Sequence, residues 1–246
     1  MSAAIRITVT KTAGSAPRDA GAQMLVWADR TEGTIGGGTL EWEAMAEARR
    51  MLRDGRATHQ ATIPLGPALG QCCGGSVSLD WQIADTLQSA DAQPLWIYGA
   101  GHVGRAIVRV MAPLPGFDIT LIDTSADRFP DTDVTTLVAA DPARVVPHAP
   151  QDAHHLILTY SHEIDLAVCH AVLCHRFQSV GLIGSATKWV RFKRRLAALG
   201  HDTAQIARIA CPIGDPSFGK HPSEIALGVA TAMIARQPSR TKERTG

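Results

Sequence analysis

Hydrophobic and polar positions alternate over short runs in the first third of the chain. Alternation of period two, carried by β-branched residues, is typical of strands with one buried face. A stretch rich in Ala, Glu, Met and Arg, from Leu40 to Leu52, predicts a helix that ends near Gly55. Residues 1–84 are therefore predicted to form a small α+β domain, with strands at 5–10, 23–27, about 58–63 and about 76–83.

From residue 95 onward the pattern changes to short, continuous apolar runs separated by helical segments. Such runs are typical of strands buried on both faces of a parallel sheet. Strands are predicted at Leu95–Tyr98, Phe117–Asp123, Thr135–Val138, Leu156–Tyr160 and Val180–Ile183, and helices up to Met111 and at about 164–176 and 187–199. The fold class is α/β: a C-terminal Rossmann-like, doubly wound parallel sheet over residues 95–238, beside the smaller N-terminal α+β domain. The polar segment 85–94 is the predicted linker, and residues 239–246 are a predicted disordered tail.

A glycine fingerprint joins the first strand of the second domain to its helix. Gly99 is expected to allow the tight turn, Gly101 to let backbone approach a pyrophosphate, and Gly104 to permit close packing of the helix on the sheet. Asp123 ends the next strand, where a carboxylate can bond a ribose hydroxyl. The helix N-terminus offers N–H groups to a phosphate. A purely structural role for these glycines, with no ligand, is the alternative.

Composition narrows the function classes. The chain has 246 residues, a formal net charge of +1 and 5% aromatic residues. Near-neutral charge argues against nucleic-acid or membrane-surface binding, and few aromatics argue against stacking on single strands. No apolar run approaches the roughly 18 residues of a membrane span, and no secretory signal is visible. The five cysteines are expected to be free thiols in a reducing cytoplasm.

Three glycine-rich stretches of the first domain suggest an anion site. They are residues 14–18, 33–41 and 65–75. Glycine at this density allows several backbone N–H groups to converge on an anion, and Arg18 could clamp a phosphate or oxo group. Gly36, Gly37 and Gly38 would place such a nest at the positive end of the helix that follows.

Cys72 and Cys73 lie between glycines in the third stretch. Neighbouring cysteines do not complete a tetrahedral zinc site alone, and no CxxC pair accompanies them. Buried structural thiols and a strained vicinal disulfide remain alternatives. The glycine flanks favour an accessible thiol that binds a soft metal or carries sulfur.

Three other features of the sequence are candidate sites. His162 and Glu163 follow a predicted parallel strand, where a proton-handling group of an oxidoreductase could lie, but nothing in their spacing marks them as catalytic. His170 and Cys174 share a helix face, and their apolar neighbours favour a buried amphipathic helix over a metal site. The basic run from Lys188 to Arg195 is typical of a solvated face, with attraction of an anionic cofactor or of an acidic partner surface as the alternatives.

Taken together, these motifs resemble the XdhC (XdhC/CoxI) family of xanthine dehydrogenase accessory proteins. The resemblance spans about residues 5–235. It is carried by the three glycine stretches, and in the second domain by 98–104, 181–185, 211–214 and 221–226. The chain departs from the family in beginning almost directly with its first strand, where relatives usually have a helix. This predicts a shorter natural form or a misplaced start codon.

The resemblance implies a cofactor chaperone rather than an enzyme. Its cargo would be the molybdenum cofactor (molybdopterin), protected while a cysteine desulfurase supplies sulfur and then inserted into apo-xanthine dehydrogenase or a related molybdenum hydroxylase. Homodimers are plausible for this class. The predicted cofactor-binding set is Arg18, Gly36, Gly37, Gly38, Gln71, Cys72, Cys73, Gly99, Gly101, Gly104 and Asp123, with Cys72 and Cys73 as metal contacts and no catalytic residue.

Two rival functions remain open from the residues alone. The Rossmann fingerprint with Asp123 suits an NAD(P)-dependent oxidoreductase that holds a dinucleotide. A structural assembly factor that grips its partner enzyme without cofactor is the third hypothesis.

Overall fold

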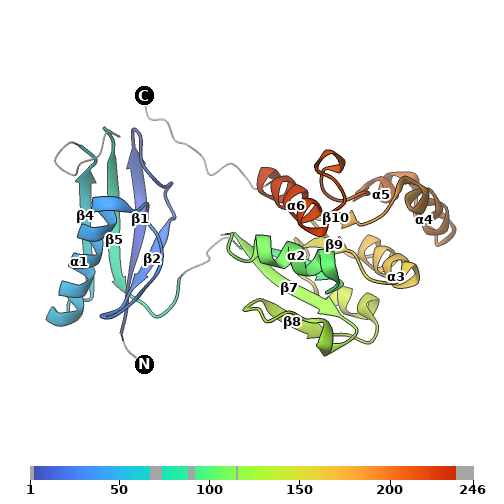
Figure 1. Cartoon of the computed structure of the whole chain (residues 1–246), viewed down its shortest axis with the longest axis horizontal. Helices are drawn as coiled ribbons and strands as arrows, with labels where there is room; N and C mark the ends of the chain where they lie inside the picture. The colour runs from blue at the N-terminus through green and yellow to red at the C-terminus, as the bar shows by residue number, and fades with distance from the viewer. Residues whose placement is uncertain (1–2, 67–73, 88–91, 115, 237–246) are drawn as a thin grey trace. The chain divides into compact units, whose positions relative to one another are not determined.

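The computed structural model describes residues 3–66, 74–87, 92–114 and 116–236. The chain divides into two compact units at residues 88–89 (Figure 1). No described helix has both the length and the apolar character needed to cross a membrane. The predicted tail 239–246 lies outside the described residues.

The first unit is a five-stranded antiparallel sheet with one long helix, and the sequence pattern predicted the helix and four of the five strands. The strand order is β3-β2-β1-β5-β4, and each neighbouring pair is antiparallel. The sequence pattern did not predict the short edge strand β3. The strands are β1 (Ile5–Ala13), β2 (Gln23–Val26), β3 (Thr31–Gly33), β4 (Thr58–Pro64) and β5 (Ser76–Ile83).

Helix α1 (Gly38–Asp54) packs its apolar face on this sheet. Leu40, Ala44 and Ala48 recur every four residues, so they share one face, and all are buried. The indole Nε1 of the fully buried Trp81 in β5 donates to the Ala44 carbonyl at 3.0 Å. This bond gives the largest core side chain a polar partner and fixes α1 against the sheet.

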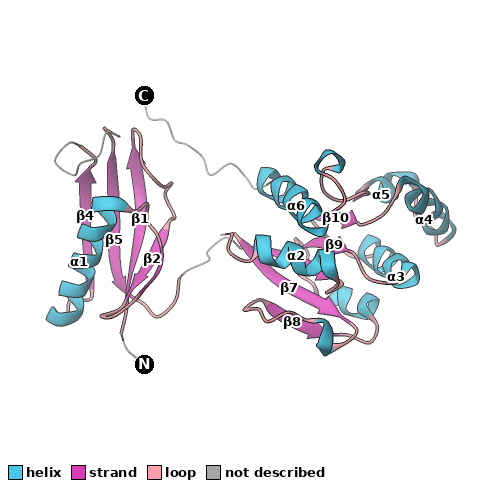
Figure 2. Ribbon diagram, in the orientation of Figure 1, coloured by secondary structure: helices cyan, strands magenta, loops and turns pink. Residues whose placement is uncertain are grey.

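The second unit contains a six-stranded, entirely parallel sheet in the order β11-β10-β9-β6-β7-β8. Its strands are β6 (Gln93–Tyr98), β7 (Phe117–Asp123), β8 (Thr135–Val138), β9 (His154–Ile157), β10 (Ser179–Leu182) and β11 (Ile209–Ala210). Its helices are α2 (His102–Met111), α3 (His162–Leu173), α4 (Ala186–Ala198), α5 (Thr203–Ala207) and α6 (Pro222–Arg236), with short helices η2 (Ala126–Arg128), η3 (Pro142–His148) and η4 (Pro216–Phe218). Figure 2 shows how these elements alternate along the unit.

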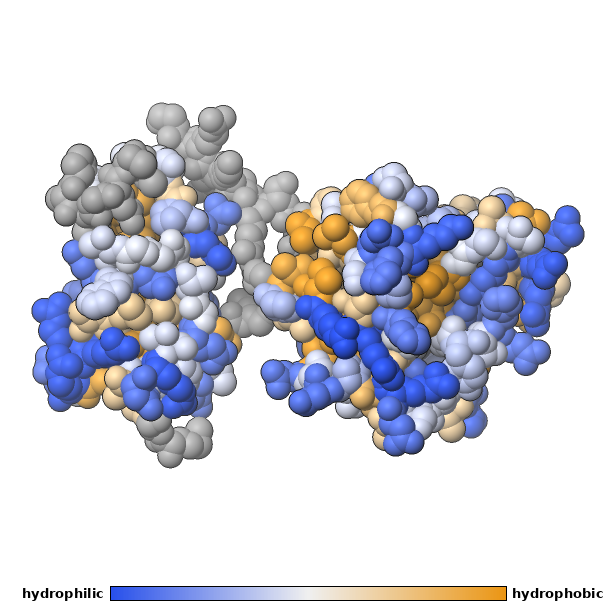
Figure 3. All heavy atoms as spheres, in the orientation of Figure 1, coloured by the Kyte–Doolittle hydropathy of each residue, from blue (hydrophilic) through white to orange (hydrophobic). Residues whose placement is uncertain are grey.

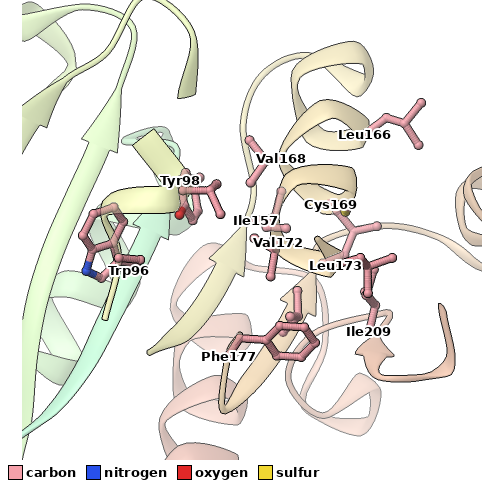
Figure 4. Close-up of a cluster of buried hydrophobic side chains, with 14 of the residues drawn as sticks. Trp96, Tyr98, Ile157, Leu166, Val168, Cys169, Val172, Leu173, Phe177 and Ile209 are labelled. Atoms are coloured by element: carbon pink, nitrogen blue, oxygen red, sulfur yellow. The ribbon is translucent and has the colours of Figure 1, made fainter. Parts of the chain in front are cut away.

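Helices cover both faces of the parallel sheet, which confirms the doubly wound prediction. Leu95 and Ile97 of β6 pack with α2 and α6, whereas Trp96 and Tyr98 point to the opposite core with α3 and α4 (Figure 4). Because successive strand residues face opposite sides, β6 must be apolar throughout. The strand order reverses between β6 and β9, and ligands of open α/β sheets bind at such a switch point.

Several boundaries differ from the pattern-based ones. Strand β6 begins at Gln93, inside the predicted linker 85–94, and α3 and β9 each begin two residues earlier than predicted. The short β11 and α5, and the longer α6, were not predicted. Helix α6 exposes Leu227 and Ile234, at 54% and 49%, and apolar side chains gather over this helix in Figure 3.

A buried ion pair ties α3 to α4. The Lys188 ammonium lies 2.6 Å from Asp165 Oδ2 and also donates to the Ile183 carbonyl at 2.8 Å. The other Asp165 oxygen accepts from the Thr159 N–H and hydroxyl at 2.9 and 2.7 Å. The Asp165 and Lys188 side chains are 0% and 10% exposed, so Lys188 is not part of a solvated basic face.

We expect Lys188→Met to lower the free energy of unfolding by about 3–5 kcal/mol, because it leaves a buried carboxylate without its cation. Adding Asp165→Asn should recover part of this loss, since the amide oxygen still accepts from Thr159 and no charge remains. Urea unfolding of the wild type, the single and the double variant measures both effects. A double variant no more stable than Lys188→Met would contradict the assignment.

Candidate functional site

The fingerprint loop lies at the switch point, where β6 and β9 end side by side. Gly99 has φ +115°, and a Cβ there would collide with the Leu158 carbonyl oxygen. A Cβ at Gly104 would collide with the carbonyl of Gly99 itself. Two of the three fingerprint glycines are therefore explained by backbone packing alone, as the structural alternative requires.

Gly101 is different, because packing does not explain it. A Cβ at this position would meet no atom within 4 Å, and its φ of −73° suits any residue. Gly101 is the N-cap of α2, where no side chain caps the helix and no acidic residue lies in the first turn. The loop thus combines open space with a helix N-terminus that no side chain caps, the combination that an anionic ligand needs.

Asp123 faces into the protein. Its side chain is 3% exposed. Oδ2 accepts from the Ala100 N–H at 2.6 Å, and Oδ1 accepts from the Thr124 N–H at 2.7 Å. The carboxylate therefore holds the glycine loop in place, and its predicted bond to a ribose hydroxyl stays a prediction.

Arg128 and Tyr160 also lie at this edge of the sheet, and the sequence pattern did not predict them as site residues. The Arg128 guanidinium carbon lies 4.5 Å over the ring of Tyr160, which is 63% exposed, and its Nε lies 3.5 Å from Asp123. Its backbone carbonyl accepts from Arg105 Nε, which also donates to the Ala100 carbonyl. The position of Arg128, five residues after Asp123, could have identified it. Rossmann proteins can place a phosphate-binding arginine near the acidic residue of the second strand.

In the first unit the structure brings the three glycine stretches together. Ser15 forms an isolated parallel bridge with Gly74, and a Cβ at Gly75 would collide with the Ser15 carbonyl. A Cβ at Gly36 would lie 2.6 Å from Pro17. The exposed Arg18 follows Pro17, so its side chain lies beside the second glycine stretch.

Gly36, Gly37 and Gly38 have φ values of +131°, +77° and +65°. Three consecutive residues in this region exclude side chains with a Cβ, which explains the glycine run. The loop is organised by Glu41, whose Oε2 accepts from Thr34 Oγ1 at 2.6 Å and from the N–H groups of Gly37 and Ile35 at 3.0 and 3.1 Å. The predicted nest is thus partly filled by the chain's own carboxylate.

Burial pushes the pKa of Glu41 upward. Hydrogen bonds from Thr34 and from the backbone N–H groups outweigh this effect and hold the pKa below its ordinary value of 4.5. Glu41 is therefore ionised at neutral pH, and Arg18 is the cation that lies beside this loop.

Of the remaining predicted site residues, Gln71, Cys72 and Cys73 lie outside the described residues. Their flanks, Gly74 and Leu65, are paired through the Gly74 N–H and the Leu65 carbonyl at 2.9 Å. Arg18 and Gly36–Gly38 lie together in the first unit, whereas the fingerprint glycines and Asp123 lie together in the second. His162 begins α3 and is exposed, with its ring edge toward Phe192.

The described cysteines differ in reactivity. Burial raises the pKa of the Cys169 thiol well above its usual range, and burial also raises that of Cys211. A thiol with a raised pKa is a poor nucleophile and metal ligand at neutral pH. Cys174 is the exposed one of these three.

An antiparallel unit with converging glycine loops, followed by a Rossmann-like domain with a glycine fingerprint, defines the class of this protein. Family models for the XdhC Rossmann domain and for the XdhC and CoxI family match residues 95–233 and 2–63. The chain belongs to the XdhC family, as its motifs predicted.

Two individual proteins are similar to this chain. The chain is 31% identical over 236 residues to the uncharacterized protein YqeB of Escherichia coli (strain K12), covering 92% of this chain and 42% of that protein. It therefore spans less than half the length of this relative. A crystal structure of a protein named as a xanthine dehydrogenase from Bacillus halodurans superimposes with a TM-score of 0.73 at 18% identity, over 99% of this chain and 95% of the other. This similarity shows a common fold.

We expect Glu41→Gln to lower the free energy of unfolding by about 1–2 kcal/mol at pH 7, because the loop N–H groups lose a charged acceptor. A carboxyl with a lowered folded pKa adds stability above its ordinary pKa, and that stability is lost as pH falls through the folded value. The difference from wild type should therefore shrink below about pH 4.5. Equal differences at pH 7 and pH 3 in urea unfolding would argue against this role.

Proposed function

We propose that this protein is a maturation factor for a molybdenum hydroxylase of the xanthine dehydrogenase type. It holds the molybdenum cofactor while a cysteine desulfurase supplies sulfur, and it delivers the cofactor to the apoenzyme. It does not itself turn over a substrate. Membership in the XdhC family supports the maturation role, and the convergence of three glycine stretches in the first unit is the observation that carries the cargo site.

The chemistry of that site suits an anionic cargo with a soft metal. Molybdopterin carries a phosphate and a molybdenum centre that favours sulfur ligands. Arg18 offers a planar donor fork to phosphate or oxo groups, and it is exposed beside the loop of Gly36 to Gly38. Cys72 and Cys73 join the third glycine stretch, whose end at Gly74 and Gly75 packs on the first stretch. A thiolate there would contact the metal or carry sulfur.

We expect Arg18→Ala to reduce the molybdenum and pterin retained per chain by about tenfold, equivalent to about 1.4 kcal/mol, because a charge-assisted contact is lost. The matched control is Arg53→Ala, an exposed arginine in the last turn of α1.

Cys72→Ala, Cys73→Ala and the double variant should impair retention or activation of the apoenzyme, with an unchanged melting temperature. The measurement is metal and pterin analysis after anaerobic purification, followed by an activation assay.

Two results would contradict this proposal. One is wild-type protein that retains no molybdenum under anaerobic conditions. The other is equal retention by the Arg18→Ala and Arg53→Ala variants, which would remove the arginine from the site. Binding of the partner enzyme that is unaffected by any glycine-loop or cysteine substitution would favour an assembly factor without cargo.

The second candidate function is an NAD(P)-dependent oxidoreductase, favoured by the open space at Gly101 and the uncapped α2. The Arg128–Tyr160 pair adds an exposed aromatic face and a cation at the same edge of the sheet. These features suit a phosphate-bearing nucleotide, but the hydrogen-bonded pair next to the loop, Tyr98 and His155, is fully buried, and burial lowers the pKa of His155 to about 3. We therefore favour a dinucleotide or pterin phosphate held without redox turnover.

We expect Gly101→Ala to keep the wild-type melting temperature while weakening NAD(P) or phosphate binding at least about tenfold, because its methyl group fills the space that a ligand phosphate would take. Gly104→Ala should instead destabilise the fold, since its Cβ collides with backbone. Calorimetric titration and thermal unfolding separate the two effects. Nicotinamide turnover by the wild type would favour the oxidoreductase, and unchanged binding by Gly101→Ala would remove this loop from the site.

A further inference from the structure

Three potential metal ligands meet at one end of α3. They are His170, Cys174 and His201, and one donor atom from each lies within 4.8 Å of the other two. His170 Nδ1 and His201 Nε2 are 2.7 Å apart, and their rings meet edge to face. His201 lies 31 residues beyond His170, so the cluster is made by the fold and not by local sequence.

Helix α3 supplies two of the three ligands. His170 and Cys174 are four residues apart and lie on one face of the helix. Cys174 is the C-cap of α3, and its N–H bonds the carbonyls of His170 and Ala171, each at 3.2 Å. The last turn therefore fixes the backbone of both residues, while the Cys174 side chain reaches solvent.

The third ligand is held between two helix-capping motifs. Gly200, with φ +95°, ends α4, where its N–H bonds Ala197 and the His201 N–H bonds Leu196, the paired bonds of a Schellman motif. Asp202, the next residue, opens α5 through a capping box with Gln205. His201 is 8% exposed and has little freedom to move away from His170.

The chemistry of the cluster suits a borderline-soft cation. Two imidazoles and a thiol are the preferred ligands of zinc and its neighbours, whereas magnesium and calcium prefer oxygen. His170 Nδ1 and His201 Nε2 share one hydrogen bond, which a metal ion bound to both nitrogens would replace.

We propose that His170, Cys174 and His201 form a zinc-type metal site with three protein ligands and one open position. At zinc–nitrogen distances of about 2.0–2.1 Å, tetrahedral nitrogens lie roughly 3.3 Å apart. The two imidazole nitrogens must therefore separate by roughly 0.6 Å from their 2.7 Å contact, while the exposed Cys174 side chain turns toward them. Both movements are small side-chain rotations about a fixed backbone.

The proposed metal site and the fingerprint loop lie at opposite edges of the parallel sheet. Helices α3 and α4 follow parallel strands and run back along the sheet, so their C-terminal ends lie at the amino edge of the strands. The Gly99–Gly104 loop lies at the carboxyl edge. A metal here would link α3 to the connection between α4 and α5, beside the exposed Cys174.

The test uses tag-free, full-length protein carrying Cys72→Ser and Cys73→Ser, so that this cysteine pair does not compete for metal. Cobalt(II) titration should show about one equivalent bound with a thiolate-to-cobalt charge-transfer band. Cys174→Ser should abolish that band and weaken zinc at least about tenfold in a chelator competition, and His201→Ala should weaken zinc similarly. The matched control is His148→Ala, an exposed histidine outside the cluster, and it should bind as the parent does.

Cys174→Ser alters an exposed side chain, so circular dichroism should show an unchanged fold, and this variant decides the outcome even if His201→Ala unfolds. A parent spectrum without a charge-transfer band would overturn the proposal. So would equal zinc affinity in the parent and in Cys174→Ser. Neither result bears on molybdenum retention, so the proposed function is tested separately.

Discussion

An internal carboxylate holds the backbone N–H groups of each glycine loop, and the candidate chemistry of both units depends on this interaction. Glu41 accepts from Gly37 and Ile35 in the first unit, and Asp123 accepts from Ala100 in the second. A glycine loop without such an acceptor would lose much of its order, because glycine gives up more backbone entropy on folding than any other residue. The carboxylates thus fix the backbone of both loops.

The same carboxylates place negative charge next to loops that are proposed to bind anions. An anion can approach only where a cation offsets that charge, since like charges at short range cost free energy. Arg18 lies beside the Gly36 loop. Nε of Arg128, whose side chain is 40% exposed, lies 3.5 Å from Asp123 Oδ1. Each loop therefore combines a carboxylate acceptor from the chain itself, positive backbone dipoles and an accessible arginine. This arrangement favours a phosphate or oxo group that can bond both N–H groups and guanidinium.

The sequence patterns predicted the fold class and most elements because strand alternation and the glycine fingerprint are local signals. The cluster of His170 and Cys174 shows where they fail: its third member, His201, is brought there by the packing of α3 against the end of α4, which no local spacing encodes. Glu41 was read as part of a motif, and its role emerged only because three positive φ values turn the loop back onto the start of α1. The fingerprint carries less information about a ligand than its pattern indicates. Backbone packing explains Gly99 and Gly104, so Gly101 is the fingerprint glycine that a ligand would explain.

Under the two proposals above, the cysteines of this chain would take part in two kinds of metal chemistry. Cys169 is buried, and both its pKa and that of Cys211 are raised, so neither suits sulfur transfer or metal binding at neutral pH. Cys174 has two imidazoles beside it, and this harder, nitrogen-rich set suits a resident divalent ion better than a molybdenum centre that favours sulfur. Cys72 and Cys73 have glycine neighbours and no histidine nearby in sequence, which under the proposed function would suit transient contact with a cargo that must be released. If both proposals hold, this difference in donor type would keep the two sites from competing for the same metal.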